Sequence, residues 1–232
     1  MAISKKRGIK SSAQDNFLEP NAVTNLTASD VGTNRPYNNG AASLSWTLPA
    51  ASPPATLYTI TSTPTTTTQT TTSTSHTFTG LTSNTSYTFT VVASNNAGSS
   101  AAVTSSSITA TTVPQAPTAS VDTGGSISSG YDRITFSANA TGGKTITTYR
   151  ITSNLRGELT ANATSPYDTA DPTLPDSSAD ENYTVYVSNA NGESLGTTTA
   201  NIQTFTPPHF PPFFPPFFPP HFPPFFLSLI HI

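Results

Sequence analysis

Four histidines are the side chains in this sequence that could bind a transition metal or carry a proton near neutral pH. His209 and His221 lie twelve residues apart in five successive tetrads of the form Pro-Pro-His/Phe-Phe. Because proline favours polyproline II, with three residues per turn, residues twelve apart share one face. Three parallel chains would then bring imidazole rings together, a ligand set that suits zinc, iron or nickel. The simpler interpretation is that histidine replaces phenylalanine as another flat ring, so we predict no metal and no cofactor.

Other groups capable of chemistry are sparse. His76 lies in Ser75-His76-Thr77-Phe78, which predicts a surface strand residue rather than a catalytic base. No nucleophile elbow, phosphate-binding loop or metal-spaced histidine pair is present. One acidic stretch could hold calcium, but its spacing matches no EF-hand and favours a solvated loop. Its members are Asp168, Asp171, Asp176, Asp180 and Glu181.

The composition also argues against catalysis. The chain has 232 residues, a formal net charge of −3, 9% charged residues and no cysteine. The missing cysteine excludes disulfides, a thiol nucleophile and thiolate metal sites. The slight acidity argues against nucleic-acid binding, and no apolar run is long enough for a transmembrane helix. We therefore predict a protein that is not an enzyme.

The elements that would position these groups are strands. Threonine and serine are abundant, and threonine favours strands over helices. Leu44, Trp46 and Leu48 alternate with polar residues, and Tyr87–Val91 is the clearest period-two segment. A last strand is predicted over about Val103–Thr112, and Pro114–Pro117 is typical of a linker.

The pattern recurs at about 90 residues, the size of one sandwich domain. Ile134-Thr135-Phe136 matches Leu44-Ser45-Trp46, and the segment from Tyr183 matches the segment from Tyr87. The prediction is an all-β fold of two tandem β-sandwiches. Its four parts are a basic extended arm, a first sandwich, a second sandwich and a tail, at residues 1–20, 21–113, 114–206 and 207–232.

The first unit resembles a fibronectin type III domain over about residues 21–113. The resemblance is carried by five residues with the spacing of that family's core: Trp46, Tyr58, Ile60, Leu81 and Tyr87. It implies that Trp46 fills the space between two sheets and that the Tyr87 hydroxyl bonds back to the backbone near Leu81. The second unit, with Tyr183 as its signature residue, is expected to be fibronectin-like or immunoglobulin-like.

The opening segment has a different resemblance. Lys5, Lys6, Arg7 and Lys10 give it a basic start, and no apolar run of a secretory signal follows. Together with residues up to Asn25, it is similar to the starts of structural proteins of tailed phages that infect marine cyanobacteria. This implies a virion protein that docks on a larger assembly.

The tail is the most unusual segment. Its phenylalanines would coat a polyproline II rod on all faces, and each buried ring contributes about 2–3 kcal/mol. Oligomerisation, for example as a trimer, or docking on a partner is therefore expected through Phe210, Phe213, Phe214, Phe217, Phe218 and Phe222. The final Leu-Ser-Leu-Ile-His-Ile breaks the repeat, so the sequence leaves open whether the natural tail continues.

These features predict a non-enzymatic phage virion structural protein, a tail or neck fibre or a surface decoration. Its partners would be other virion proteins, a second copy of itself, or a host-surface protein or glycan. Tyr37, Tyr131 and Tyr167 are the candidates for glycan contact. The alternative is an extracellular bacterial module, adhesive or associated with carbohydrate. The host, the receptor and the oligomeric state stay open.

Overall fold

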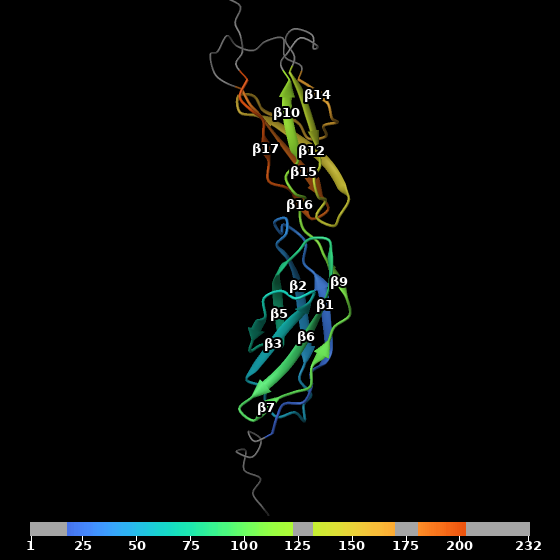
Figure 1. Cartoon of the computed structure of the whole chain (residues 1–232), viewed down its shortest axis with the longest axis vertical. Coiled ribbons are helices and arrows are strands. Elements are labelled where there is room, and N and C mark those ends of the chain that lie inside the picture. The colour runs from blue at the N-terminus through green and yellow to red at the C-terminus, as the bar shows by residue number, and fades with distance from the viewer. Residues whose placement is uncertain (1–17, 123–131, 170–180, 203–232) are drawn as a thin grey trace, which may run out of the picture.

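The computed structural model describes residues 18–122, 132–169 and 181–202. Within these ranges every regular element is a β-strand, so the fold is all-β. The strands form two β-sandwiches joined end to end, with the first in blue to green and the second in green to orange (Figure 1).

The first sandwich packs two sheets over one core. One sheet has the order β1-β2-β5, and the other has the order β4-β3-β6-β7 with β8 and β9 also paired to β6. The strands of the first sheet are β1 (Thr24–Asp30), β2 (Gly40–Thr47) and β5 (Ser75–Leu81). Those of the second are β3 (Leu57–Thr63), β4 (Gln69–Thr71), β6 (Thr85–Asn95), β7 (Gly98–Ser99), β8 (Val103–Thr104) and β9 (Ile108–Ala110).

The alternation in the sequence determines which face of β6 enters this core. Tyr87, Phe89, Val91 and Ala93 are buried, while the residues between them, Thr88, Thr90 and Val92, are only partly buried. Alternate side chains of a strand point to opposite faces, so one face of β6 is apolar throughout. The hydroxyls of Thr90 and Thr104 pair across strands on the other face at 3.0 Å.

The second sandwich repeats this plan. Its sheets have the orders β10-β11-β14 and β13-β12-β15-β16, with β17 also paired to β15. The first comprises β10 (Thr118–Asp122), β11 (Arg133–Ser137) and β14 (Tyr167–Asp168). The second comprises β12 (Ile146–Ser153), β13 (Gly157–Thr160), β15 (Tyr183–Asn189), β16 (Gly192–Glu193) and β17 (Thr197–Thr198).

Strand pairing corrects the alignment of the two repeats. Thr90 pairs with Thr104 in the first sandwich, and Thr184 pairs with Thr198 in the second. The same offset aligns Tyr183 with Phe89. The backbone carbonyl of each accepts from the amide of the residue sixteen positions later, and the backbone amide of each donates to that residue's side-chain hydroxyl. It also places Glu181, which bridges Ile202, at the position of Tyr87, which pairs with Ile108. The match of Tyr183 to Tyr87 was therefore wrong by two residues.

The continuous last strand predicted over Val103–Thr112 was also wrong. It is interrupted between β8 and β9 by Ser105, whose buried hydroxyl accepts a hydrogen bond from the Phe89 amide at 3.1 Å. The Ser105 side chain thus takes the place of a backbone carbonyl as the acceptor for the β6 amide of Phe89. Thr199 does the same for Tyr183 in the second sandwich.

Candidate functional site at the junction of the two sandwiches

Two asparagines in the turn between β15 and β16 connect the second sandwich to the end of the first. The Asn189 side-chain amide donates to the carbonyls of Thr112 and Thr141 at 2.9 and 2.8 Å. The side-chain oxygen of Asn189 accepts a hydrogen bond from the backbone amide of Asn191 at 2.8 Å, and both asparagines are buried. Since a buried amide without partners is costly, these contacts fix the turn on the connecting chain.

Asn191 extends the junction to the loop before β2. Its side-chain amide donates to the Thr111 hydroxyl at 2.8 Å, and its backbone carbonyl accepts from the Asn34 amide at 2.7 Å. The Thr111 hydroxyl in turn donates to the carboxylate of Asp30, which also accepts from the Thr111 amide. Three segments of the first sandwich and one turn of the second are thus connected.

The junction depends on the close approach of Gly32. A Cβ at this position would lie 2.2 Å from the Thr111 hydroxyl oxygen and 2.5 Å from the Asn191 side-chain nitrogen. A larger residue at position 32 would have to displace the Thr111 and Asn191 side chains, which hydrogen-bond to each other there. The predicted linker at Pro114–Pro117 is accordingly part of a packed junction, in which Pro114 and Pro117 are both buried.

The first sandwich uses the equivalent asparagine in the same way. Asn95 ends β6 as Asn189 ends β15, and its amide donates to the carbonyl of Leu18 at 2.8 Å. The side-chain oxygen of Asn95 accepts from the backbone amide of Ala97 at 2.9 Å, just as the side-chain oxygen of Asn189 accepts from the backbone amide of Asn191. Each sandwich therefore binds the chain that enters it with the last residue of its long central strand.

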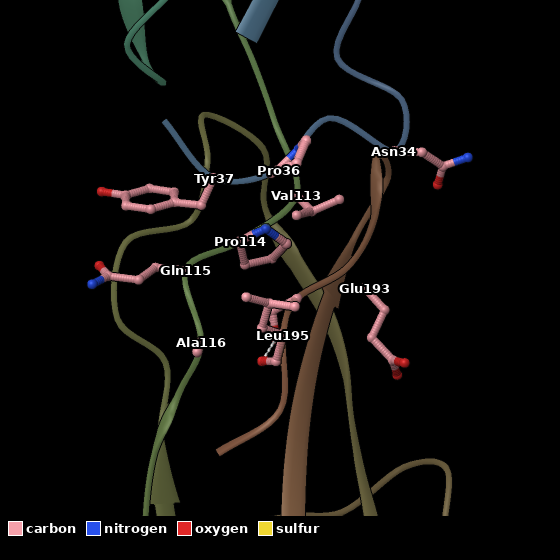
Figure 2. Close-up of a pocket in the computed structure, with 10 residues that line it drawn as sticks. Asn34, Pro36, Tyr37, Val113, Pro114, Gln115, Ala116, Glu193 and Leu195 are labelled. Carbon is pink, nitrogen blue, oxygen red and sulfur yellow. Dashed lines mark hydrogen bonds between the residues drawn. The ribbon is translucent and has the colours of Figure 1, made fainter. Parts of the chain in front are cut away.

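A pocket of about 520 Å³ opens beside this junction. Figure 2 shows Tyr37 and Gln115 on one side and Glu193 on the other, with Pro114 and Leu195 between them. The residues that line it come from both sandwiches and the chain between them: Asn34, Pro36, Tyr37, Val113, Pro114, Gln115, Ala116, Glu193, Ser194 and Leu195. Most of these side chains are apolar, and Leu195 is 82% exposed.

Glu193 is the one charged side chain among the ten described residues that line this pocket. Its carboxylate accepts two hydrogen bonds from the Arg150 guanidinium, at 2.9 and 2.7 Å. That guanidinium lies 4.0 Å from the centre of the Tyr186 ring, and the bond to Glu193 raises the pKa of Arg150 above its usual range. The pocket thus presents an apolar surface whose single charge is already neutralised.

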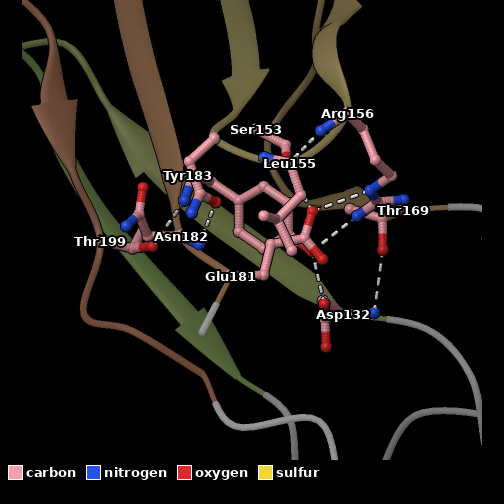
Figure 3. Close-up of polar contacts among 10 residues, drawn as sticks. Asp132, Ser153, Leu155, Arg156, Thr169, Glu181, Asn182, Tyr183 and Thr199 are labelled. Atoms are coloured by element: carbon pink, nitrogen blue, oxygen red, sulfur yellow. Dashed lines mark hydrogen bonds and ion pairs between the residues drawn. The ribbon is translucent and has the colours of Figure 1, made fainter. Parts of the chain in front are cut away.

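A second polar cluster lies inside the second sandwich (Figure 3). Glu181 is fully buried, and its Oε1 accepts from the Ser153 hydroxyl and from the Arg156 guanidinium, the latter at 2.8 Å. The guanidinium also donates to the Tyr183 hydroxyl at 2.7 Å, and that hydroxyl donates to Asp132. Burial, followed by the bond to Asp132, raises the pKa of Tyr183 well above its usual value. The tyrosine therefore stays protonated, which suits a hydrogen-bond donor rather than a proton-transfer group.

The residues expected to form the first core lie where they can pack together. Trp46, Tyr58, Ile60, Leu81 and Tyr87 are all buried in one cluster, and the Trp46 and Tyr58 rings meet edge to face at 5.2 Å. The Tyr87 hydroxyl accepts from the Thr82 amide at 3.1 Å, which is the geometry of a tyrosine corner. In the second sandwich Tyr183 is fully buried, and the rings of Phe136 and Tyr149 meet at a tilted angle with their centres 4.9 Å apart.

The other candidates are scattered. His76 lies on β5 and pairs with the Gln69 side chain at 3.0 Å. Tyr37 lines the pocket, whereas Tyr167 lies in β14 and packs against the second core instead of lying in a loop. Asp168 pairs with Arg133 at 2.6 Å. Several other candidates lie outside the described residues: the basic residues of the arm, Tyr131, Asp171, Asp176, Asp180, the tail phenylalanines, His209 and His221.

The junction asparagines were not predicted as functional residues. The sequence held a signal for them, because Ser-Asn-Asn-Ala-Gly after the first long strand recurs as Ser-Asn-Ala-Asn-Gly after the second. Among the described residues no three histidine, aspartate or glutamate side chains gather in a way that could hold a metal. The same residues contain no helix that is long and apolar enough to cross a membrane.

Comparisons with known proteins give a family for one part of the chain. Residues 21–111 match the family model of the fibronectin type III domain. A search of curated proteins finds no match. Domains of this family are in general binding and structural modules, typical of extracellular proteins.

Solved structures of such domains are also similar to this chain. FN3tt mut is 25% identical over 40% of this chain and 97% of its own, with a TM-score of 0.32. The FN1–FN3 domains of chicken CNTN1 are 18% identical over 78% of this chain and 65% of theirs, with a TM-score of 0.40. Domains A168–A170 of titin are 15% identical over 75% of this chain and 61% of their own, with a TM-score of 0.37. With its buried Trp46 and its tyrosine corner at Tyr87, the segment 21–111 is a fibronectin type III domain.

Proposed function

We propose that this chain is a non-enzymatic structural protein of a phage virion, in which two sandwiches form a spacer between a basic arm and an associating tail. The observation that carries the proposal is the hydrogen-bonded junction of Asn189 and Asn191 with the first sandwich. Tandem domains joined by a free linker move independently by default. A buried, fully paired junction instead transmits position along the molecule, which is what a fibre or decoration requires.

The similarity of the opening segment to phage structural proteins supports the virion part of this proposal, and the phenylalanine repeat supports association through the tail. The partners would be other virion proteins or further copies of this chain. The Ser153 hydroxyl beside Glu181 and the Tyr183 hydroxyl beside Asp132 are both held in internal hydrogen bonds of the second sandwich. A spacer or surface-binding role needs no reactive group.

Solution mass tests the associating tail. The full chain should form a discrete oligomer, and a chain without residues 207–232 should be a monomer. If both are monomers, the tail is a docking peptide and self-association is wrong. Small-angle scattering of the monomer tests the spacer, because a fixed junction gives one extended profile, whereas independent domains give a broad one.

Labelling of particles tests the location. An antibody against residues 21–206 should bind intact particles of the phage that encodes the chain. Binding only to secreted bacterial material would instead favour the alternative, an extracellular adhesive or carbohydrate-associated module. Tyr37 at the rim of the pocket is the feature that favours this second function. On a glycan array, binding that the Tyr37→Ala variant loses would support the carbohydrate-associated function. Absence of binding by the unchanged chain would contradict it.

A further inference from the structure

We propose that the junction pocket binds one Pro-Pro-Phe-Phe unit of the same chain's tail, centred on Phe213 and Phe214. The proposal is independent of the virion assignment, since it concerns a contact within one molecule. One tetrad would occupy the pocket, so the remaining tetrads stay available for association.

The chemistry of the pocket fits this occupant. Proline-rich peptides dock on grooves lined with aromatic side chains, and Tyr37 supplies such a ring here, with Pro36 and Pro114 in the same pocket wall. The volume of about 520 Å³ lies within the range of about 300–1,000 Å³ typical of pockets for small ligands. Ala116 and Leu195 complete an apolar surface that a phenylalanine ring could cover.

Charge also matches. Glu193 is neutralised by Arg150, so the pocket has no free charge to attract an ionic ligand. Residues 203–232 contain no aspartate, glutamate, lysine or arginine, so an uncharged segment meets an uncharged surface.

The length of the tail allows the contact. The tail follows Ile202, which bridges Glu181 at the end of β15 that lies far from Asn189 and the junction. Because this bridge is antiparallel, the chain leaves Ile202 in the direction away from the junction, and the tail must turn back to reach the pocket. Eight residues of strand span about 26 Å at ~3.3 Å each. Polyproline II advances ~3.1 Å per residue, so about nine residues cover the same distance. The 30 residues that follow Ile202 (232 − 202) are therefore long enough to turn back to the pocket, and Pro211–Phe214 is the first tetrad for which the shortest path allows contact.

The absence of cysteine from the sequence permits a direct test on the full chain. Gln115→Cys places a thiol on the exposed rim of the pocket, and Phe213→Cys places one in the second tetrad. The matched control is Thr145→Cys with Phe213→Cys. Thr145 is exposed and precedes Ile146, which pairs with Asn189, so it lies at the same end of the sandwich outside the pocket lining.

Under mild oxidation the double variant Gln115→Cys, Phe213→Cys should form its disulfide within one chain at least about tenfold faster than the control variant, because docking raises the effective concentration. Equal rates for the two variants would overturn the proposal. A disulfide between two chains, seen as a dimer by mass, would overturn it as well, because the tail would then dock on a second copy.

Accessibility provides a second measurement that keeps the tail thiol-free. In the Gln115→Cys chain, replacing every phenylalanine from 210 to 226 by serine should speed labelling by a maleimide several-fold. In the Thr145→Cys chain, the same replacement should leave the labelling rate unchanged. If the serine tail leaves the labelling rate at position 115 unchanged, the tail does not cover the pocket. If the natural tail protects position 115 only at high protein concentration, the tail of a second copy covers the pocket, and the proposal is wrong.

Discussion

The same position in the two sandwiches is occupied by two very different side chains. Tyr87 in the first and Glu181 in the second hold equivalent places beside β9 and Ile202, and both are buried. The tyrosine hydroxyl accepts one bond from a backbone amide five residues earlier. The glutamate bonds to Ser153 and Arg156, on the neighbouring strand β12 and the turn that follows it.

This difference shows what the sandwich requires at that position. A buried polar group needs a partner, but the partner can be a local amide or a distant cation. The tyrosine corner ties a loop to its own strand. The ion pair of Glu181 with Arg156 ties two strands of one sheet to a turn. The same guanidinium also bonds to the Tyr183 hydroxyl, which in turn donates to Asp132.

The two sandwiches also differ in how far they rely on aromatic contacts and on ion pairs. The first relies on aromatic contacts, including Trp46 with Tyr58 and Phe78 with Phe89 at 5.1 Å. The second has Phe136 with Tyr149, and several ion pairs elsewhere on its sheets. We therefore expect the first sandwich to resist changes of charge and pH, and the second to respond to both.

Removing the cation should have the largest effect. Arg156→Ala leaves the Glu181 carboxylate, which is 0% exposed, without its cation, and should lower the unfolding free energy of the second sandwich by about 3–5 kcal/mol. Far-UV circular dichroism in urea measures the loss. Trp46, the single tryptophan, reports the first sandwich separately, and its fluorescence transition should not move.

Arg150→Ala is the matched control, because Arg150 is paired on the surface with Glu193. Surface pairs contribute ~0–1 kcal/mol, so its effect should be several-fold smaller. Equal losses for the two variants would contradict the view that the Glu181 pair is structurally special.

Removing the corner hydroxyl should have the next largest effect, this time on the first sandwich. Tyr87→Phe leaves the partly buried Thr82 amide without its acceptor, at a cost of about 1–3 kcal/mol. The measurement is the urea midpoint of Trp46 fluorescence. Thr90→Val, which removes an exposed hydroxyl pair, should stay within ~0.5 kcal/mol. The corner would be unimportant if the two variants behaved alike.

A smaller effect is expected at the junction. Asn191→Ala removes the side-chain hydrogen bonds to the Thr111 hydroxyl and the Thr112 carbonyl and should cost about 1–2 kcal/mol, while the scattering profile broadens as the sandwiches move independently. Asn95→Ala, at the equivalent end of the first sandwich, should leave the scattering profile of the two sandwiches unchanged. An unchanged profile for the Asn191 variant would show that the junction is held by other contacts.

The smallest effect concerns pH. The hydrogen bond from Arg133 lowers the pKa of Asp168 below its usual value. A carboxyl with a lowered pKa contributes stability above its ordinary pKa, and this contribution is lost as the pH falls through the folded pKa. Carbon-13 titration of the Asp168 carboxyl should show the lowered value, and Arg133→Gln should return it to the ordinary range. An unchanged titration curve in that variant would assign the shift to another cause.

Sequence reasoning succeeded where the pattern is local. Alternation along Tyr87–Val91 and Leu44–Trp46 indicated the all-β fold, because side chains of period two must face one core. It failed where a single side chain interrupts the ladder. Ser105 divides the last strand of the first sandwich, and nothing in the residues themselves distinguishes a serine in a strand from one that replaces a carbonyl.

The alignment of the repeats failed for a related reason. A shared Tyr-Thr pair placed Tyr183 opposite Tyr87, whereas strand pairing places it opposite Phe89. Side-chain similarity is ambiguous by two residues in a strand, since a shift of two keeps the same face inward. Only the register of hydrogen bonds resolves it.

The sequence by itself determined the strands, the aromatic core of the first sandwich and the uncharged phenylalanine tail, because local periodicity and composition suffice for these. The tertiary structure decided the partner of Glu181, the junction of Asn189 and Asn191, and the pocket beside it. Each of these joins residues that are distant along the chain, such as Thr111 with Asn191. Their contact follows from the packing of whole sheets, which no local pattern encodes.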